Sequence, residues 1–289
     1  MKVRSGPAVF VALLAVLPWP SPAEGQIEVW GTEGQVDFSE FRIANVVPHG
    51  QPLIPYFEGW YPNPDGTRTA SFGYFNLNTE EIFNIPIGPD NYIEPEEYNG
   101  VQPTHFMPAP SERGRNRRHE SVFAITVPGD YQGEITWTLR AQGLTIPGES
   151  SFGTDAYEMM NIESATSSPV APNMRVGDSP LGRGRLGPVA GPVIVRIGEP
   201  LPLDIGLDLL GREGSIVTWY HHQGPGEVTF GEERFVVEGA PEGEVVLQTI
   251  ATFSEPGEYM LRVTALENLS SLVQHCCWTN GYLHVTVTP

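Results

Sequence analysis

Cysteine and lysine are almost absent from this sequence. The first shortage excludes disulfides between distant strands, and the second contributes to a strongly acidic chain. Of 289 residues, the only cysteines are the adjacent pair Cys276 and Cys277, which cannot link distant strands, so packing must stabilise the fold. Lys2 is the only lysine, and the formal net charge is −19 at pH 7. A chain this acidic is expected to bind neither nucleic acid nor anionic lipid.

Long apolar runs are also absent, apart from one near the start. Residues 8–17 are apolar, follow the positive Lys2 and Arg4, and form a run too short to span a bilayer. Proline and alanine within 20–23 resemble the approach to a cleavage site. We therefore predict a secretory signal peptide in residues 1–26, with a retained N-terminal anchor as the alternative, and no transmembrane segment in the mature chain.

Helical periodicity is absent as well, and the composition is typical of strands. Glycine (32 residues) and proline (28) are both abundant, as expected for many short strands joined by turns, while a hydrophobic content of 40% is enough for a packed core. The length allows two domains of ordinary size. We predict an all-β fold made of two β-sandwich, immunoglobulin-like domains.

The clearest strand pattern lies in the last third of the chain. Apolar residues alternate with polar residues, glycine or proline over 201–209. The same period of two returns in four later segments, 217–219, 249–253, 259–263 and 283–287. About seven short strands within roughly 100 residues are typical of an immunoglobulin-type sandwich, which we place at residues 193–289.

A family resemblance is carried by the same region. Trp219, then GPGEVTF at 224–230 and ATFSEPGEYMLRVTA at 251–265, resemble the PKD-like (polycystic-kidney-disease-like) immunoglobulin-fold modules of bacterial surface and secreted proteins. The resemblance covers about 190 to 289 and implies that Trp219 is a core tryptophan and Tyr259 a corner tyrosine. Such modules serve as spacers, adhesive units or partners of an attached domain. The loop ENLSSLVQHCCWTNGY departs from them by its length.

The N-terminal region is predicted to form a first β-sandwich, over residues 27–163. The sequence Asn-Pro-Asp-Gly at 63–66 is a strong turn signal between two aromatic strands, and 122–127 and 134–139 have the pattern of further strands. Phrases such as GWYPNPDGT resemble secreted bacterial proteins of no assigned role. Residues 164–192 are rich in serine, proline and glycine, and we predict an interdomain linker there.

The adjacent cysteines lie in the sharpest candidate site. His275, Cys276, Cys277 and His284 offer thiolate and imidazole ligands that suit zinc or copper(I), although the CxxC spacing of zinc and redox motifs is missing. The alternative is a vicinal disulfide between Cys276 and Cys277, which export favours. We predict this disulfide, and we expect it to shape the last loop into a contact surface that carries Trp278, Asn280 and Tyr282.

A second candidate site is an acidic loop that offers hard oxygen ligands for calcium. Its candidate ligands are Asp90, Asn91, Glu94, Glu96 and Glu97. The DxDxDG spacing of a calcium loop is missing, and a solvated acidic face is the alternative.

A third candidate surface lies on the aromatic hairpin. Trp60 and Tyr61 are predicted to contact a ligand or partner, because exposed aromatic side chains stack on sugar rings or dock on proteins. Packing of these rings in the core is the alternative.

These features favour a non-catalytic binding or structural protein that is secreted, periplasmic or on the cell surface. Its expected partner is a protein or glycan of the cell envelope. The motifs GxSxG and HExxH and a phosphate-binding glycine loop are absent, so no catalytic residue is predicted, and calcium is the only candidate cofactor. Two alternatives stay open: a carbohydrate-binding or calcium-dependent adhesion module, and an accessory subunit of a secreted enzyme with its site at the loop 275–277.

Overall fold

The computed structural model describes five segments, residues 47–109, 117–159, 171–212, 214–267 and 278–289. These segments lie within one compact unit, Val46–Pro289. The predicted signal peptide and the pair Cys276 and Cys277 fall outside the described residues, and both predictions stay predictions.

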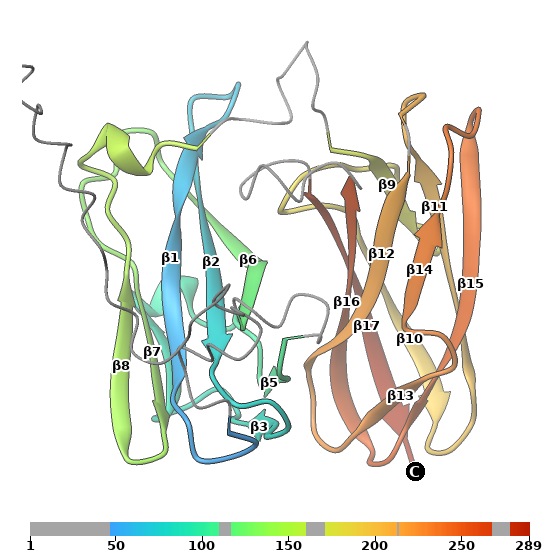
Figure 1. Cartoon of the computed structure of the whole chain (residues 1–289), viewed down its shortest axis with the longest axis horizontal. Helices are drawn as coiled ribbons and strands as arrows, with labels where there is room; N and C mark the ends of the chain where they lie inside the picture. The colour runs from blue at the N-terminus through green and yellow to red at the C-terminus, as the bar shows by residue number, and fades with distance from the viewer. Residues whose placement is uncertain (1–46, 110–116, 160–170, 213, 268–277) are drawn as a thin grey trace, which may run out of the picture. The chain divides into compact units, whose positions relative to one another are not determined.

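Strands make up nearly all the regular structure of the described residues. The exceptions are two short 3₁₀ helices, η1 (Glu96–Tyr98) and η3 (Asp155–Tyr157). The predicted all-β fold is therefore confirmed. Two separate hydrophobic cores divide the strands into an N-terminal half, residues 47–159, and a C-terminal half, residues 171–289 (Figure 1). Because both halves belong to one compact unit, the predicted count of two domains stays a prediction.

The N-terminal half places a sheet of order β1-β2-β6 against a sheet of order β4-β7-β8, with the small sheet β3-β5 beside them. The strands are β1 (Leu53–Pro62), β2 (Arg68–Asn76), β3 (Phe83–Asn84), β4 (Asn91–Glu94), β5 (His105–Phe106), β6 (Arg118–Val127), β7 (Thr136–Ala141) and β8 (Leu144–Glu149). The predicted hairpin is confirmed: β1 and β2 are antiparallel, and the Gly66 N–H donates to the Asn63 carbonyl at 3.0 Å. Between the sheets, Trp137 packs edge-on against Phe123, with ring centres 4.9 Å apart.

The C-terminal half has the two-sheet arrangement of an immunoglobulin-like sandwich. One sheet has the order β13-β15-β11-β9 and the other β10-β17-β16-β12-β14. The strands are β9 (Asn173–Val176), β10 (Val189–Arg196), β11 (Leu201–Asp208), β12 (Ser215–Gln223), β13 (Val228–Phe230), β14 (Arg234–Val237), β15 (Glu244–Phe253), β16 (Gly257–Glu267) and β17 (Trp278–Thr288).

Two residues fix the core of this sandwich as expected. Trp219 is 2% exposed between the sheets. The Tyr259 hydroxyl donates to the Glu255 carbonyl at 2.8 Å, which is the local contact that a corner tyrosine makes at the start of its strand. The immunoglobulin-like fold predicted for this region is confirmed.

The predicted linker, 164–192, differs from the structure over its described part. Asn173–Val176 is strand β9, which pairs with β11, and β10 starts at Val189 and pairs in parallel with β17. Met174 and Val176 are buried in the C-terminal core. Proline and glycine exclude central strands but are tolerated in short edge strands, and the sequence pattern cannot make that distinction. This part of the chain therefore belongs to the C-terminal sandwich.

Candidate functional site

The aromatic pair predicted to meet a ligand is buried. Trp60 is 8% exposed and lies in the N-terminal core, while Tyr61 is 1% exposed and has the guanidinium of Arg185 5.6 Å from its ring centre. A shift in the β1–β2 register between Phe57 and Gly59 precedes four consecutive buried residues, so this strand is covered on both faces. The prediction that Trp60 and Tyr61 form an exposed contact surface is wrong.

Of the predicted contact residues of the last strand, Asn280 contacts the N-terminal half of the same chain, through Ser121. Trp278 and Asn280 are buried and Tyr282 is half-buried. The Asn280 side-chain amide donates to the carbonyls of Ser121 and Arg185 at 2.9 and 3.0 Å. The sequence marks these residues as unusual for a final strand, but it cannot reveal that Asn280 bonds to Ser121 of the same chain.

The acidic loop does not present its candidate ligands together. Asn91 is buried: its amide donates to the carbonyls of Ile85 and Pro103 at 3.0 and 2.7 Å, and its oxygen accepts from the Trp137 indole at 3.0 Å. The other four, Asp90, Glu94, Glu96 and Glu97, are exposed. Within the described segments, no group of three or more His, Cys, Asp or Glu side chains is arranged to hold a metal ion. The calcium site stays a prediction, and Asn91 acts as a structural residue.

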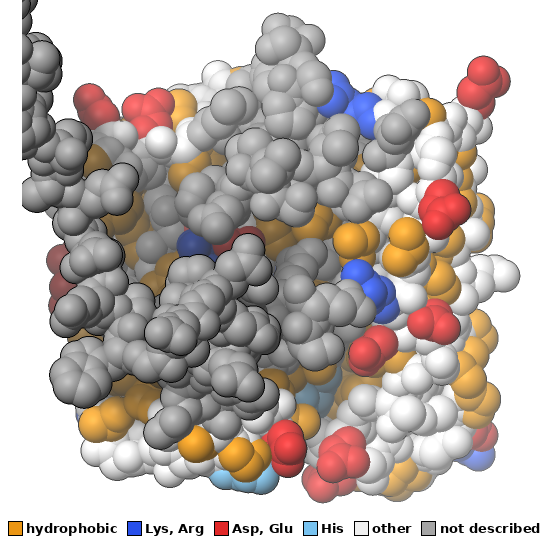
Figure 2. Space-filling view, in the orientation of Figure 1, with side chains coloured by type: hydrophobic (Ala, Val, Ile, Leu, Met, Phe, Trp, Pro, Cys, Tyr) orange, Lys and Arg blue, Asp and Glu red, His pale blue; other side chains and the backbone are white. Residues whose placement is uncertain are grey.

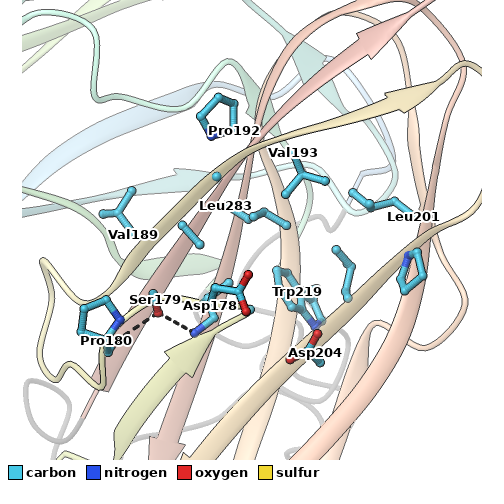
Figure 3. A pocket seen from close by; sticks show the side chains of 16 residues that line it. Asp178, Ser179, Pro180, Val189, Pro192, Val193, Leu201, Asp204, Trp219 and Leu283 are labelled. Atoms are coloured by element: carbon cyan, nitrogen blue, oxygen red, sulfur yellow. Dashed lines mark hydrogen bonds between the residues drawn. The ribbon is translucent and has the colours of Figure 1, made fainter.

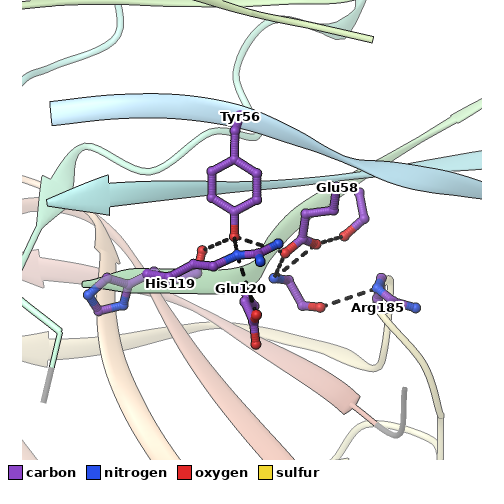
Figure 4. A network of polar contacts seen from close by, with 8 residues as sticks. Tyr56, Glu58, His119, Glu120 and Arg185 are labelled. Carbon is purple, nitrogen blue, oxygen red and sulfur yellow. Dashed lines mark hydrogen bonds and ion pairs between the residues drawn. The ribbon is translucent and has the colours of Figure 1, made fainter. Parts of the chain in front are cut away.

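The backbone of Ser121 in β6 joins the two halves. Its φ of 50° lies in the left-handed region, where the β2–β6 register shifts. The Ser121 N–H donates to both carboxylate oxygens of Glu58, at 3.0 and 3.1 Å (Figure 4). Its carbonyl accepts from Arg262 at 3.0 Å and from Asn280 at 2.9 Å, and its hydroxyl lies 3.2 Å from Arg185 Nε. One residue therefore bonds to the N-terminal half through its N–H and to the C-terminal half through its oxygens.

Glu58 is the buried carboxylate that anchors this junction. It accepts from the Ser71 hydroxyl at 2.5 Å and from the Tyr56 hydroxyl at 3.2 Å, in addition to the Ser121 N–H. Arg118 Nε in turn donates to the Tyr56 hydroxyl at 2.6 Å. Burial raises the pKa of the Tyr56 hydroxyl well above its ordinary value, and the Glu58 charge adds to this. Position 73 must be glycine here, because a Cβ would clash with the backbone carbonyl oxygen of His119 as well as with the Tyr56 hydroxyl.

A second set of contacts joins the halves at the end of β12. The loop residue Thr104 donates its N–H to the His222 carbonyl at 2.8 Å, and a ring nitrogen of His222 lies 2.9 Å from the Val101 carbonyl. Gln223 donates its side-chain amide to the carbonyls of Gly100 and Gln102 at 2.9 and 2.7 Å. The long loop of the N-terminal half is thereby held against the C-terminal sandwich.

Three histidines with lowered pKa lie in or next to this second set of contacts. The rings of His105 and His221 stack with centres 4.5 Å apart. Burial lowers the pKa of His105 to about 4 and that of His221 to about 3. Burial, followed by the charge of Arg262, lowers the pKa of His222 to about 3. A protonated His222 would lack solvent and face the positive charge of Arg262, so its contact with the Val101 carbonyl favours the uncharged ring.

The arginine cleft is a polar cavity of about 160 Å³ between the halves. Its walls come from β6, β12, β14, β16 and β17 and from the turn before β14. The charged lining residues are Arg118, Arg234, Arg262, Glu120 and Glu233, and the others are His119, Ile216, Thr218, Tyr220, Thr264 and Trp278. Arg118 pairs with Glu120 at 3.3 Å. Figure 4 shows His119 and Glu120 beside the junction.

The edge groove is a larger cavity, about 580 Å³, on the open side of the C-terminal sandwich. One wall is formed by 176–180 with 201–204, and the other by 189–193, from edge strand β10 (Figure 3). The buried side chains of Trp219 and Leu283 form its floor. The ionisable residues of the lining are two carboxylates, Asp178 and Asp204.

Sequence reasoning missed Ser121, Arg185 and Arg262, the residues on which the junction depends. Arg262 occupies an outward position of an alternating strand and is therefore expected in solvent, yet it is 3% exposed. Arg185, in a glycine-rich segment that resembles a linker, is 1% exposed. No local pattern distinguishes an outward position that faces water from one that faces another part of the protein.

Comparison with known proteins gives only distant likeness. No family model matches the chain, and no curated protein matches it. Among solved structures, a CARDB domain from Pyrococcus furiosus is 16% identical, with a TM-score of 0.29, over 45% of this chain and 98% of that one. The titin immunoglobulin tandem A164-A165 is 12% identical (TM-score 0.23; 82% and 99% covered), and the D0-D1 domain of intimin 7% identical (0.25; 80% and 97%). Likeness at this level carries no information on ligand, partner or activity.

None of the helices among the described residues has the length and apolar character that crossing a bilayer requires.

Proposed function

We propose that this chain is a secreted or envelope-associated, non-catalytic binding protein whose C-terminal sandwich is a PKD-like module. The edge groove carries this proposal. At about 580 Å³ it has the size of a ligand site, it combines an apolar floor with an acidic rim, and it borders the exposed edge strand β10, in which Ile194 is 72% exposed. An edge strand next to a groove is a surface to which extended segments of partner proteins add.

The occupant that fits the groove is an extended segment with alternating apolar and basic residues. Val189 and Val193 offer exposed apolar surface above the buried floor, and the rim offers Asp178 and Asp204 to cations. Arg175 is hydrogen-bonded to Glu244, which raises its pKa, and the charges of Asp204 and Asp178 add to this rise, so Arg175 offsets part of the negative charge of the rim. The net charge of −19 favours approach of a basic partner from a distance.

A glycan partner has less support in this structure. The aromatic side chains expected to stack on sugar rings, Trp60 and Tyr61, are buried. The enzyme-subunit alternative depends on the loop 275–277, which lies outside the described residues. The basic peptide in the edge groove is therefore the partner chemistry that we propose.

Binding of a labelled nine-residue peptide of alternating valine and lysine to the purified protein tests this proposal. Fluorescence anisotropy is expected to show saturable binding that the valine–glutamate peptide does not share. Asp178→Asn combined with Asp204→Asn should weaken binding about tenfold, since each rim charge contributes up to about 1 kcal/mol. Asp130→Asn, an exposed aspartate in the N-terminal half, is the control. Equal binding of both peptides, or none of the lysine peptide, would reject the groove as the partner site.

A further inference from the structure

The starting observation is a buried arginine that has no anionic partner among the described residues. Arg262 is 3% exposed, its Nη1 donates to the Ser121 carbonyl at 3.0 Å, and its guanidinium lies 4.5 Å from the centre of the Tyr220 ring. Its Nε has no hydrogen-bond partner, and no carboxylate among the described residues forms an ion pair with it. A buried charge without a counter-charge is strongly destabilising, so this arrangement calls for an anion.

The surroundings of Arg262 strengthen that requirement. The arginine cleft, which Arg262 lines, also contains Arg118 and Arg234. Of its two carboxylates, Glu120 is paired with Arg118, and Glu233 is exposed. Among the described lining residues, three guanidinium groups and two carboxylates leave an excess of one positive charge, and neither carboxylate forms an ion pair with Arg262. The charge of Arg262 also reaches His222, whose pKa it helps to lower.

The cavity has the size and the wall chemistry for an organic anion. Its volume of about 160 Å³ is well above the roughly 10–15 Å³ that one water requires. Tyr220, Trp278 and Ile216 supply apolar and aromatic wall surface. Arginine guanidinium groups pair with planar carboxylates through two parallel hydrogen bonds, for which the unpartnered Nε–H is one donor.

We propose that the arginine cleft is a binding site for a small organic carboxylate, which supplies the counter-charge of Arg262 and stabilises the junction between the two halves. The site is separate from the edge groove and shares no lining residue with it. The carboxylate proposal can therefore be tested independently of the proposed peptide partner.

Ligand-induced stabilisation of the full chain provides the test. Tm is measured in chloride and in succinate, benzoate, phosphate and sulfate at matched ionic strength, and titration calorimetry follows for each anion that raises it. We expect succinate or benzoate to raise Tm in a saturable way, because a ligand that binds only the folded state stabilises it. We expect phosphate and sulfate to act no more strongly than chloride. A stronger response to phosphate or sulfate would overturn the carboxylate assignment, and no response to either carboxylate would overturn the site.

Substitution of Arg262 separates a specific site from a general salt effect. Arg262→Met keeps the length of the side chain and removes its charge, and the Ser121 carbonyl still accepts from Asn280. We expect this variant to lose the carboxylate response at least tenfold while its Tm in chloride stays equal to or above that of the wild type. Arg196→Met, an exposed arginine of β10, is the matched control and should respond as wild type does. An unchanged carboxylate response in Arg262→Met would overturn the proposal.

A second variant keeps the test decisive if Arg262→Met does not fold. Arg234→Met alters the half-buried opposite wall of the cleft and leaves Arg262 and its bond to Ser121 in place. It should weaken the carboxylate response several-fold, and a response equal to that of the wild type would count against the cleft.

Discussion

The two halves of this molecule differ in the sheet faces that they leave in water. In the C-terminal half, the core rows are apolar: Val217, Leu261 and Val285 are completely buried, while Val246 on the outer face of the other sheet is 54% exposed. In the N-terminal half, the sheet β1-β2-β6 is covered on both faces and buries Glu58 and many other polar groups. A sheet with one face in water is stabilised mainly by burial of its apolar face, which alternating apolar and polar residues provide. A sheet with two covered faces needs a hydrogen-bond partner for each polar group that the second cover removes from water.

Removing the largest apolar side chain from the C-terminal core should have the largest effect. Trp219→Ala is expected to lower the free energy of unfolding by roughly 3–5 kcal/mol, because it leaves a cavity between tightly packed sheets. Chemical denaturation followed by circular dichroism measures this. Since the halves form one compact unit, we expect a single transition in which both halves unfold together. A loss below about 1 kcal/mol would contradict the core position of Trp219.

Removing the buried carboxylate of Glu58 tests whether its hydrogen bonds stabilise the N-terminal half. Glu58→Ala should lower the free energy of unfolding by about 2–3 kcal/mol, because the Ser121 N–H and the Ser71 hydroxyl lose their acceptor. Glu58→Gln keeps one acceptor oxygen and should lose less. Glu149→Ala, an exposed glutamate of β8, is the control and should change stability by no more than about 0.5 kcal/mol. Equal effects of Glu58→Ala and Glu149→Ala would show that the junction does not depend on the carboxylate.

Acid should weaken the contact at the end of β12. The folded-state pKa of His222, about 3, lies below the unfolded value of about 6.5. The unfolded chain therefore binds the extra proton first, so the stability that this residue contributes is complete above pH 6.5 and is lost as the pH falls toward 3. Between pH 7 and pH 5 the expected loss is roughly 2 kcal/mol, by proton linkage.

Comparison of variants isolates this effect from the titration of carboxylates. His222→Gln should lose less stability between pH 7 and pH 5 than the wild type does, whereas the exposed His49→Gln should follow the wild-type curve. Parallel curves for wild type and His222→Gln, measured by denaturation at each pH, would show that His222 is not held neutral.

Substitutions at Ser121 should change the free energy of unfolding the least. Their order is unusual, because the glycine variant should be more stable than the alanine variant. Ser121→Ala removes the hydroxyl that lies 3.2 Å from Arg185 Nε and keeps the left-handed φ of 50°, so a loss of about 1 kcal/mol is expected. Ser121→Gly loses the same contact but relieves the backbone strain, and it should be the more stable of the two by about 1 kcal/mol. Ser254, whose hydroxyl accepts from the Glu227 N–H at 2.7 Å, is a control position for the usual order, in which alanine is at least as stable as glycine.

The sequence predicts the strands that bury one apolar face in a regular alternation. It does not predict the strands that lack this alternation. The alternation of 201–209, the buried Trp219 and the corner contact of Tyr259 were all predictable, because each follows from one apolar face or from a local hydrogen bond. The segment 164–192 was not, because its short strands are stabilised by the sheets that they join.

The candidate sites were less predictable than the fold. Trp60 and Tyr61 are residue types that often occur at binding surfaces. They are buried because both faces of their sheet are covered. The importance of Arg262 depends on residues more than a hundred positions away, such as Ser121. A contact of that range leaves no trace in the local pattern of either strand.

The junction at Ser121 has a consequence for how such a protein can evolve. Immunoglobulin-like modules are readily duplicated and exchanged between genes when their surfaces are independent of their neighbours. Here an excised C-terminal half would expose Arg262, Asn280 and Trp278, all of which are buried against residues of β6 or beside them. Recombination at the boundary would therefore be selected against, and the positions that meet at Ser121 should change together during divergence. The two halves are expected to stay together in one gene.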